Sequence, residues 1–128
     1  MNFILSQRSV DKLRGVHPDL VRVVHRAIQL TPIDFAITCG TRSQEEQRQL
    51  VAEGKSRTMN SRHLTGHAVD FVALIDGRAS WKNWAHYQQI AQAFKHAALE
   101  LGIAIVWGGD WAKFRDGPHI ELDRRVYQ

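Results

Sequence analysis

An aspartate interrupts the most apolar stretch of this chain. Residues 68–74 read AVDFVAL, a pattern that predicts a strand with Asp70 on the face opposite Val69 and Phe71. A carboxylate in such a strand is costly to bury unless another charge, a hydrogen bond or a metal ion compensates it. A histidine, His63, precedes the strand closely enough to be a candidate partner. The fold must therefore bring a compensating group to Asp70.

The bulk properties are those of one globular domain. The 128 residues are 44% hydrophobic and 23% charged, which fits a single core. No apolar run approaches the ~20 residues that span a bilayer. The N-terminus also lacks the basic start and long apolar region of a secretory signal. We therefore expect a polypeptide made in the cytoplasm, with no stable membrane association. The single cysteine, Cys39, excludes an internal disulfide.

The chain is basic, with a formal net charge of +4 and a pI near 9.6. Such a charge favours a polyanionic partner such as nucleic acid, anionic lipid or bacterial cell wall. The lysines and arginines are scattered, and no nucleic-acid-binding motif is recognisable. We therefore expect no nucleic-acid partner.

Helical and strand patterns are mixed without regular β-α-β alternation, which predicts an α+β fold. Periodicity, a capping box at Ser43 and Glu46, and breakers such as Pro32 and Gly102 set the expected boundaries. The expected helices are 7–14, 18–30, 43–53 and 80–101, and the expected strands are 34–39, 68–74, 103–107 and 119–122. Residues 55–62 are expected to form a polar loop, and no linker or repeat suggests a domain boundary.

The C-terminal stretch WGGDWAKFRDGPHIEL adds His119, with Asp116 shortly before it. With His63 and Asp70, His119 completes a set of three candidate ligands. Catalytic zinc sites use three protein ligands and leave a fourth position to a water, whose pKa falls from ~15.7 toward ~7. Asp116 is placed to take a proton from that water and return it to the leaving amine. Glu121 shares a strand face with His119, which fits either a hydrogen-bond partner of that imidazole or a surface ion pair.

These motifs together resemble one family of zinc peptidases. The pattern SxHxxGxAxD over 61–70, followed by DGPH over 116–119, is similar to D-alanyl-D-alanine carboxypeptidases and dipeptidases and to phage L-alanyl-D-glutamate endopeptidases. The family shares the Hedgehog/DD-peptidase fold. FAITCGTRS resembles its strand and arginine-bearing turn, and WGGDW resembles its aromatic substrate loop. The resemblance covers nearly the whole chain.

The resemblance implies one catalytic Zn²⁺ and a set of site residues. These are His63, Asp70 and His119 as zinc ligands, Asp116 and Arg42 in catalysis, and Ser61, Trp107, Asp110 and Trp111 in substrate binding. Arg42 matches the arginine that contacts the substrate or the developing oxyanion, a role that suits a permanent positive charge. Many carboxypeptidase relatives carry glutamate where this chain has Asp116, and the aspartate favours the phage endolysin branch.

The resemblance also implies an architecture and an activity. We expect a small, mainly antiparallel sheet packed with helices, forming one zinc peptidase domain over 1–128 with no separate cell-wall-binding domain. The expected function is that of a monomeric phage endolysin that hydrolyses the L-alanyl-D-glutamate bond of the peptidoglycan stem peptide. It would wait in the host cytoplasm, depend on a holin for release and act on the periplasmic wall.

Three alternatives stay open at this point. The first is a D-alanyl-D-alanine carboxypeptidase of the same fold, and the second is a non-catalytic, zinc-containing module that binds cell wall. The retained Asp116 argues against the second. The third is a cysteine peptidase that would use Cys39 and a histidine.

Overall fold

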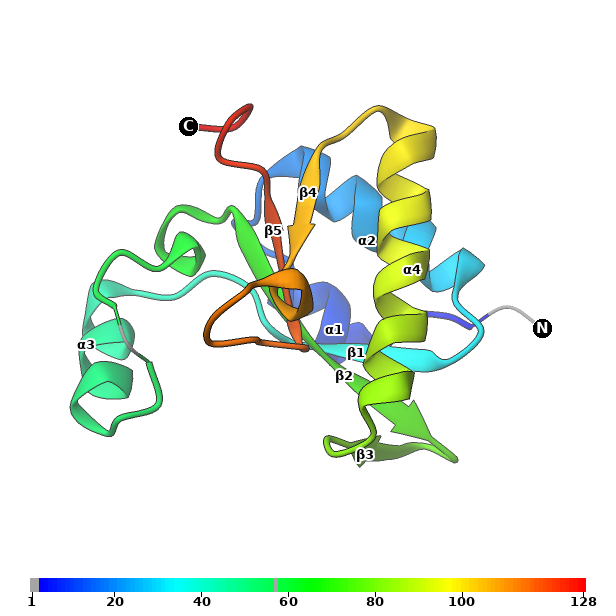
Figure 1. Cartoon of the computed structure of the whole chain (residues 1–128), viewed down its shortest axis with the longest axis horizontal. Coiled ribbons are helices and arrows are strands. Elements are labelled where there is room, and N and C mark those ends of the chain that lie inside the picture. Colours follow the sequence, from blue (N-terminus) through cyan, green and yellow to red (C-terminus); the bar gives the residue numbers. More distant parts are fainter. Residues whose placement is uncertain (1–2, 57) are drawn as a thin grey trace.

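A five-stranded antiparallel sheet organises the molecule (Figure 1). The computed structural model describes residues 3–56 and 58–128. The strands are β1 (Asp34–Cys39), β2 (Ala68–Ile75), β3 (Arg78–Ser80), β4 (Ile105–Trp107) and β5 (His119–Leu122). Their order is β1-β2-β5-β4, and β3 pairs with the end of β2. The expected α+β fold with a small antiparallel sheet is confirmed.

The described residues also form four α-helices. They are α1 (Gln7–Lys12), α2 (Pro18–Leu30), α3 (Gln44–Ala52) and α4 (Trp84–Leu101), with short 3-10 helices η1 (Arg62–Thr65) and η2 (Gly108–Asp110). The helix α4 packs on the sheet through Phe94, whose ring lies 5.3 Å from Phe71 and 5.1 Å from Phe35. Figure 1 shows α3 at the opposite side of the molecule from α4. Within the described residues, no helix is both long and apolar enough to cross a lipid bilayer.

Most predicted elements are present, with one clear error at the start of the long helix. The sequence placed the helix start at Ser80, but Arg78–Ser80 pairs back onto β2 as β3. The turn residues Asp76 and Gly77 have φ values of 53° and 77°, which suits a tight hairpin. The helix α4 begins only at Trp84, where the side chain of Asn83 accepts a hydrogen bond from the amide of Ala85.

Smaller differences concern three other segments. The predicted helix 7–14 is shorter, because α1 ends at Lys12. The predicted loop over 55–62 ends in the first residue of η1, and its Arg57 lies outside the described residues. The predicted strand 103–107 is shorter, because β4 begins at Ile105. The capping box at Ser43 and Glu46 is present as predicted.

The aspartate that interrupts the apolar strand lies in the middle of the sheet. Asp70 is opposite Cys39 in β1 and opposite His119 in β5. Its neighbours Val69 and Phe71 are fully buried, as their alternation with Asp70 predicts. The register alone therefore brings one of the two predicted imidazoles beside the carboxylate.

Candidate metal centre

The Asp70 carboxylate faces both predicted imidazoles. Its Oδ1 atom lies 3.3 Å from Nε2 of His63 and 3.1 Å from Nδ1 of His119. The sheet register positions His119, whereas η1 carries His63 and ends at Gly66 with φ 75°. A Cβ at Gly66 would lie 2.4 Å from the carbonyl oxygen of Gly15, so this turn requires glycine. Both predicted imidazoles thus lie against the same oxygen of Asp70.

Hydrogen bonds behind the imidazoles orient their lone pairs. Nδ1 of His63 lies 2.7 Å from the carbonyl oxygen of Gly40, and Nε2 of His119 lies 2.9 Å from Oε1 of Glu121. Both oxygens accept, so in the neutral imidazoles these nitrogens carry the hydrogen. The lone pairs of the other two nitrogens then point at Asp70. Two imidazole nitrogens and one carboxylate oxygen form a ligand set typical of catalytic zinc.

One atom of this cluster supports the metal assignment directly. Nε2 of His63 is buried and has no hydrogen-bond partner among the residues that the structure describes. Buried polar atoms are nearly always satisfied, so an orphaned ring nitrogen that faces a carboxylate calls for a cation. The residues present therefore fit a zinc ion.

Glu121 is the partner of His119. Its side chain is buried, and its second oxygen, Oε2, lies 3.1 Å from Nε of Arg124 and 3.9 Å from Nε of Arg62. The sequence left open whether Glu121 would orient the imidazole or form a surface ion pair. The hydrogen bond to Nε2 of His119 identifies it as the residue that orients the imidazole, and the two arginines lie on its outer side.

The charges in the cluster favour a bound cation. Burial alone would lower the pKa of His63, but the Asp70 carboxylate outweighs burial and raises that pKa to about 10. Burial would raise the pKa of Asp70, yet the neighbouring His119 and His63 hold it well below its usual range. The site therefore attracts positive charge, and a proton and a metal compete for the same nitrogen atoms.

Asp116 lies beside the ligands in the loop between β4 and β5. A carboxylate oxygen of Asp116 is within 4.8 Å of ligand atoms of Asp70 and His119. Burial raises the pKa of Asp116, and the negative charge of Asp70 raises it further. A carboxylate with a raised pKa is a better proton acceptor, which suits the predicted catalytic role.

The position of Asp116 depends on a close approach of two backbone segments. The amide of Asp116 donates to the carbonyl oxygen of Gly108 at 3.0 Å, and the amide of His119 donates to the carbonyl oxygen of Asp116 at 3.2 Å. A Cβ at Gly108 would lie 2.3 Å from the carbonyl oxygen of Asp116 and 3.0 Å from Cβ of His119. Only glycine fits there without moving the loop.

The residues predicted for the aromatic substrate loop lie in different environments. Trp107 is buried, and its Nε1 donates to the carbonyl oxygen of Gly117 at 2.7 Å, so this hydrogen bond anchors the loop that carries Asp116. The Trp111 ring is partly exposed and lies 5.2 Å from the His119 ring. Asp110 forms an ion pair with Lys95 at 2.6 Å. Their substrate contacts remain predictions.

Arg42 lies at the other edge of the centre. It donates to Oδ2 of Asp70 at 3.3 Å and to Oε1 of Gln47 at 3.0 Å. The fully buried Gln47 was missed by sequence reasoning, because nothing in the polar α3 pattern distinguishes it from its neighbours. It also donates to Ser56 and to Thr58, and so fixes the loop that leads to η1. Sequence reasoning likewise gave Gly40 no role, although its carbonyl oxygen orients His63.

Ser61 and Cys39 both lie next to His63. The Ser61 hydroxyl accepts a hydrogen bond from the amide of His63 at 3.2 Å and caps η1, so its predicted substrate contact remains a prediction. The thiol of Cys39 lies 3.7 Å from Nδ1 of His63, and Cys39, His63 and Asp70 form a second possible ligand group. The other possible ligand group consists of Asp70, Asp116 and His119, and Asp70 is common to both groups.

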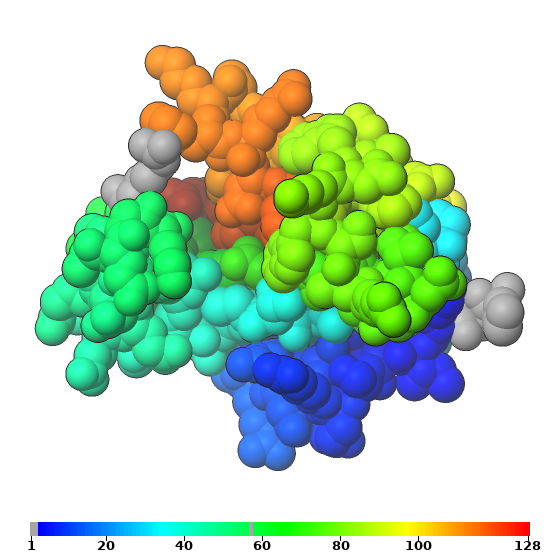
Figure 2. All heavy atoms as spheres, turned by 90° about the horizontal axis from the view of Figure 1, so that it is seen from below, coloured from blue at the N-terminus to red at the C-terminus, as the bar shows by residue number. Residues whose placement is uncertain are grey.

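The molecular surface is hollowed near this centre. Figure 2 shows the hollow between α3, in teal, and the start of α4, in yellow-green. The orange segment that includes the loop before β5 forms one side of the hollow (Figure 2). A substrate that lies in this hollow has access to the loop that carries Asp116.

Comparisons with known proteins agree with the geometry. The family profile described as phage L-alanyl-D-glutamate peptidase matches residues 1–127. The L-alanyl-D-glutamate peptidase of Escherichia phage T5 is 35% identical over 130 residues, which cover 99% of this chain and 94% of the relative. The crystal structure of the L-Ala D-Glu endopeptidase ChiX of Serratia marcescens has 50% identity and a TM-score of 0.90, covering 97% of this chain and 93% of ChiX.

A more distant structure shows the same fold. The vancomycin-resistance D,D-dipeptidase VanXYg is 17% identical with a TM-score of 0.55, and the match covers 84% of this chain and 50% of VanXYg. At that identity the likeness supports the fold alone. The matches that extend over nearly the whole chain are to proteins named for cleavage between L-alanine and D-glutamate.

Proposed function

The chain belongs to the phage L-alanyl-D-glutamate peptidase family, and we propose that His63, Asp70 and His119 hold its catalytic zinc ion. The protein is a peptidoglycan endopeptidase that hydrolyses the L-alanyl-D-glutamate bond. One observation above all supports the ligand assignment. Two imidazoles, each with an acceptor behind it, direct their free nitrogens at one oxygen of Asp70.

The ligands and their neighbours suggest a division of labour. A zinc ion held there would lower the pKa of a water molecule and polarise the scissile carbonyl. Asp116 accepts the proton of the attacking water and delivers it to the amine of the departing D-glutamate. Arg42 steadies Asp70 through Oδ2 and places a fixed positive charge where negative charge develops on the carbonyl oxygen.

The biological setting follows from the same family. We propose that the protein acts as an endolysin, a monomer that leaves the host cytoplasm through a membrane permeabilised by a holin and then degrades the periplasmic wall. The phage T5 relative supports this setting. The net charge of +4 would assist adsorption to an anionic wall.

Muropeptide mapping tests the chemistry. Purified protein loaded with zinc should release peptides that begin at D-glutamate, and a chelator should abolish the release. We expect Asp116→Asn to lower kcat by about 10²–10⁴, the usual contribution of a general base, while zinc still binds stoichiometrically.

Asp76→Asn is the matched control for Asp116→Asn. It removes the same charge in the β2–β3 turn, where asparagine tolerates the positive φ, so activity should be unchanged. Full activity of Asp116→Asn, or loss of terminal D-alanine instead of cleavage before D-glutamate, would refute the assignment.

A further inference from the structure

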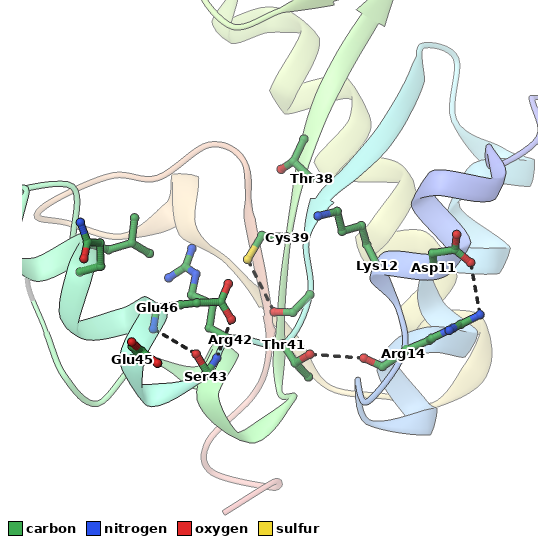
Figure 3. Close-up of a pocket in the computed structure, with 13 residues that line it drawn as sticks. Asp11, Lys12, Arg14, Thr38, Cys39, Thr41, Arg42, Ser43, Glu45 and Glu46 are labelled. Atoms are coloured by element: carbon green, nitrogen blue, oxygen red, sulfur yellow. Dashed lines mark hydrogen bonds and ion pairs between the residues drawn. The ribbon is translucent and has the colours of Figure 1, made fainter.

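A cavity of about 650 Å³ lies beside the metal centre, between α1 and α3 (Figure 3). Lys12 and Arg14 line it on the α1 side, Glu46 and Leu50 line it on the α3 side, and Gly40 at the end of β1 separates the two walls. Its volume is within the range of roughly 300–1,000 Å³ that small-molecule and peptide sites occupy. None of the roles assigned above uses this cavity.

The cavity adjoins the reactive centre through two of its lining residues. Cys39 lines it, and the sulfur lies 3.7 Å from Nδ1 of His63. Arg42 lines it as well, and its guanidinium donates to Asp70. Cys39 lies on the side of His63 that faces Gly40, so Arg42 is the residue that borders both the metal centre and the cavity. A peptide cleaved at the metal centre would enter the cavity past the Arg42 side chain.

One cation in the cavity has no partner to neutralise it. Arg14 pairs with Asp11 at 3.6 Å, and Arg42 pairs with Asp70. Lys12 forms no ion pair or side-chain hydrogen bond with any residue in the described ranges 3–56 and 58–128. Figure 3 shows its side chain reaching from α1 toward the end of β1.

A carboxylate faces Lys12 across the cavity. Oε1 of Glu46 accepts a hydrogen bond from the amide of Ser43 at 3.0 Å. That hydrogen bond is the main cause of the lowered pKa of Glu46, and the charges of Arg42 and Lys12 contribute. Lys12 therefore acts on Glu46 electrostatically without contacting it. Six charged side chains line the cavity, and among them Lys12 and Glu46 lie on opposite walls; the others are Asp11, Arg14, Arg42 and Glu45.

The substrate has a chemical group that matches such a pair, and this step rests on the proposed function. In peptidoglycan the residue after D-glutamate is commonly a diamino acid. Diaminopimelate ends in a free amino acid group, with one carboxylate and one ammonium on the same carbon, whereas lysine ends in an ammonium alone. Two extended residues past the cut span about 7 Å, and the γ-linkage of glutamate lengthens this reach.

We propose that the cavity binds the free amino acid end of a diaminopimelate in the third position of the stem peptide, with Lys12 receiving its carboxylate and Glu46 its ammonium. The endopeptidase thereby selects walls built with diaminopimelate over walls built with lysine. The selection acts through Lys12, because only the carboxylate distinguishes the two diamino acids at this end. A charge-assisted hydrogen bond of this kind changes affinity by roughly tenfold to a hundredfold.

Two synthetic peptides test the proposal: L-alanyl-γ-D-glutamyl-diaminopimelate and its lysine counterpart. Zinc-loaded wild type should cleave both at the L-alanyl-D-glutamate bond, with kcat/KM about 10–100 times higher for the diaminopimelate peptide. Lys12→Gln should remove that preference by lowering kcat/KM for the diaminopimelate peptide alone. Arg8→Gln is the matched control, because it removes one positive charge from α1 at a residue that does not line the cavity.

A second variant tests the opposite wall. Glu46→Gln retains a side-chain oxygen that can accept from Ser43 and so preserves the capping box. It should lower kcat/KM for both peptides by a similar factor, and it should have no effect when the terminal amine is acetylated.

The outcomes separate this proposal from the proposed function. If neither peptide is cleaved between L-alanine and D-glutamate, the proposed function fails. If wild type cleaves both peptides equally well, or if Lys12→Gln slows both to the same extent, the function stands and the diaminopimelate site is refuted.

Discussion

Removal of the Glu121 side chain tests whether the metal centre depends on the orientation of His119. In the wild-type protein Glu121 accepts the hydrogen bond from Nε2 of His119 and neutralises two neighbouring arginines. Glu121→Ala leaves that N–H without an acceptor and lets the imidazole rotate or change tautomer. Glu121→Gln retains an acceptor oxygen but removes the charge.

The expected magnitude follows from these contacts. Loss of the residue that orients a metal-binding histidine typically costs about 10–100-fold in metal affinity. That factor corresponds to roughly 1.4–2.8 kcal/mol. We expect Glu121→Ala to fall in this range and Glu121→Gln to lose less than about tenfold, because its amide oxygen can still accept from Nε2. Glu121→Ala also leaves Arg62, whose side chain is only 12% exposed, without its acidic neighbour.

The assay is competition for zinc against a chromogenic chelator at fixed pH, with thermal unfolding of the metal-free and zinc-loaded forms measured in parallel. Zinc raises the melting temperature only through binding to the folded state, so the shift reports affinity separately from intrinsic stability. Glu100→Ala is the control, since it removes an exposed glutamate that pairs with Arg26 away from the centre. Wild-type zinc affinity in Glu121→Ala would refute the orienting role, whatever happens to stability.

Two further predictions concern the loop and the ligands. Gly108→Ala should lower kcat by at least about tenfold and destabilise the fold by about 1–3 kcal/mol, because the added Cβ would displace Asp116. Gly54→Ala is the control: its Cβ would have open space around it, so this variant should lose stability without a change in kcat. Unchanged kinetics in Gly108→Ala would show that the loop adapts. Asp70 raises the pKa of His63 to about 10 despite burial, so a proton occupies the zinc-binding nitrogen at neutral pH. Zinc must displace that proton. The apparent zinc affinity should therefore rise roughly tenfold per pH unit for each proton displaced. Calorimetry in buffers of different ionisation enthalpy counts those protons, and an affinity that stays constant from pH 6 to 8 would contradict this reasoning.

The parts of the site that the sequence predicted are those with a local signature. Asp70 was predicted because the charge of an acidic residue in an apolar strand must be neutralised or hydrogen-bonded. His119 was predicted from the DGPH motif, which leads into the predicted strand 119–122. The structure joins the two by strand register, which alternation makes predictable once the pairing is known. Helices with caps or breakers, such as α2 and α3, were likewise found at nearly the correct bounds.

The remaining parts depend on tertiary contacts that leave no pattern in the sequence. Gln47 is one polar residue among several in α3, and only folding shows that it is buried against Arg42. β3 is too short for an alternating pattern, so it was not predicted, and its last residue, Ser80, was assigned to the start of the long helix. The diaminopimelate cavity is formed where α1 and α3, distant in sequence, face each other across the end of β1.

The pairing of β2 along both of its edges at Asp70 has a consequence for how this enzyme can diversify. Two of the proposed zinc ligands, Asp70 and His119, lie on paired strands at the centre of the sheet, whereas the residues that line the cavity belong mostly to peripheral segments. Mutations in those segments can change which type of bacterial cell wall is degraded while the metal centre keeps its geometry. Substitutions that alter host range should therefore accumulate in the peripheral segments and spare β2 and the strands that pair with it.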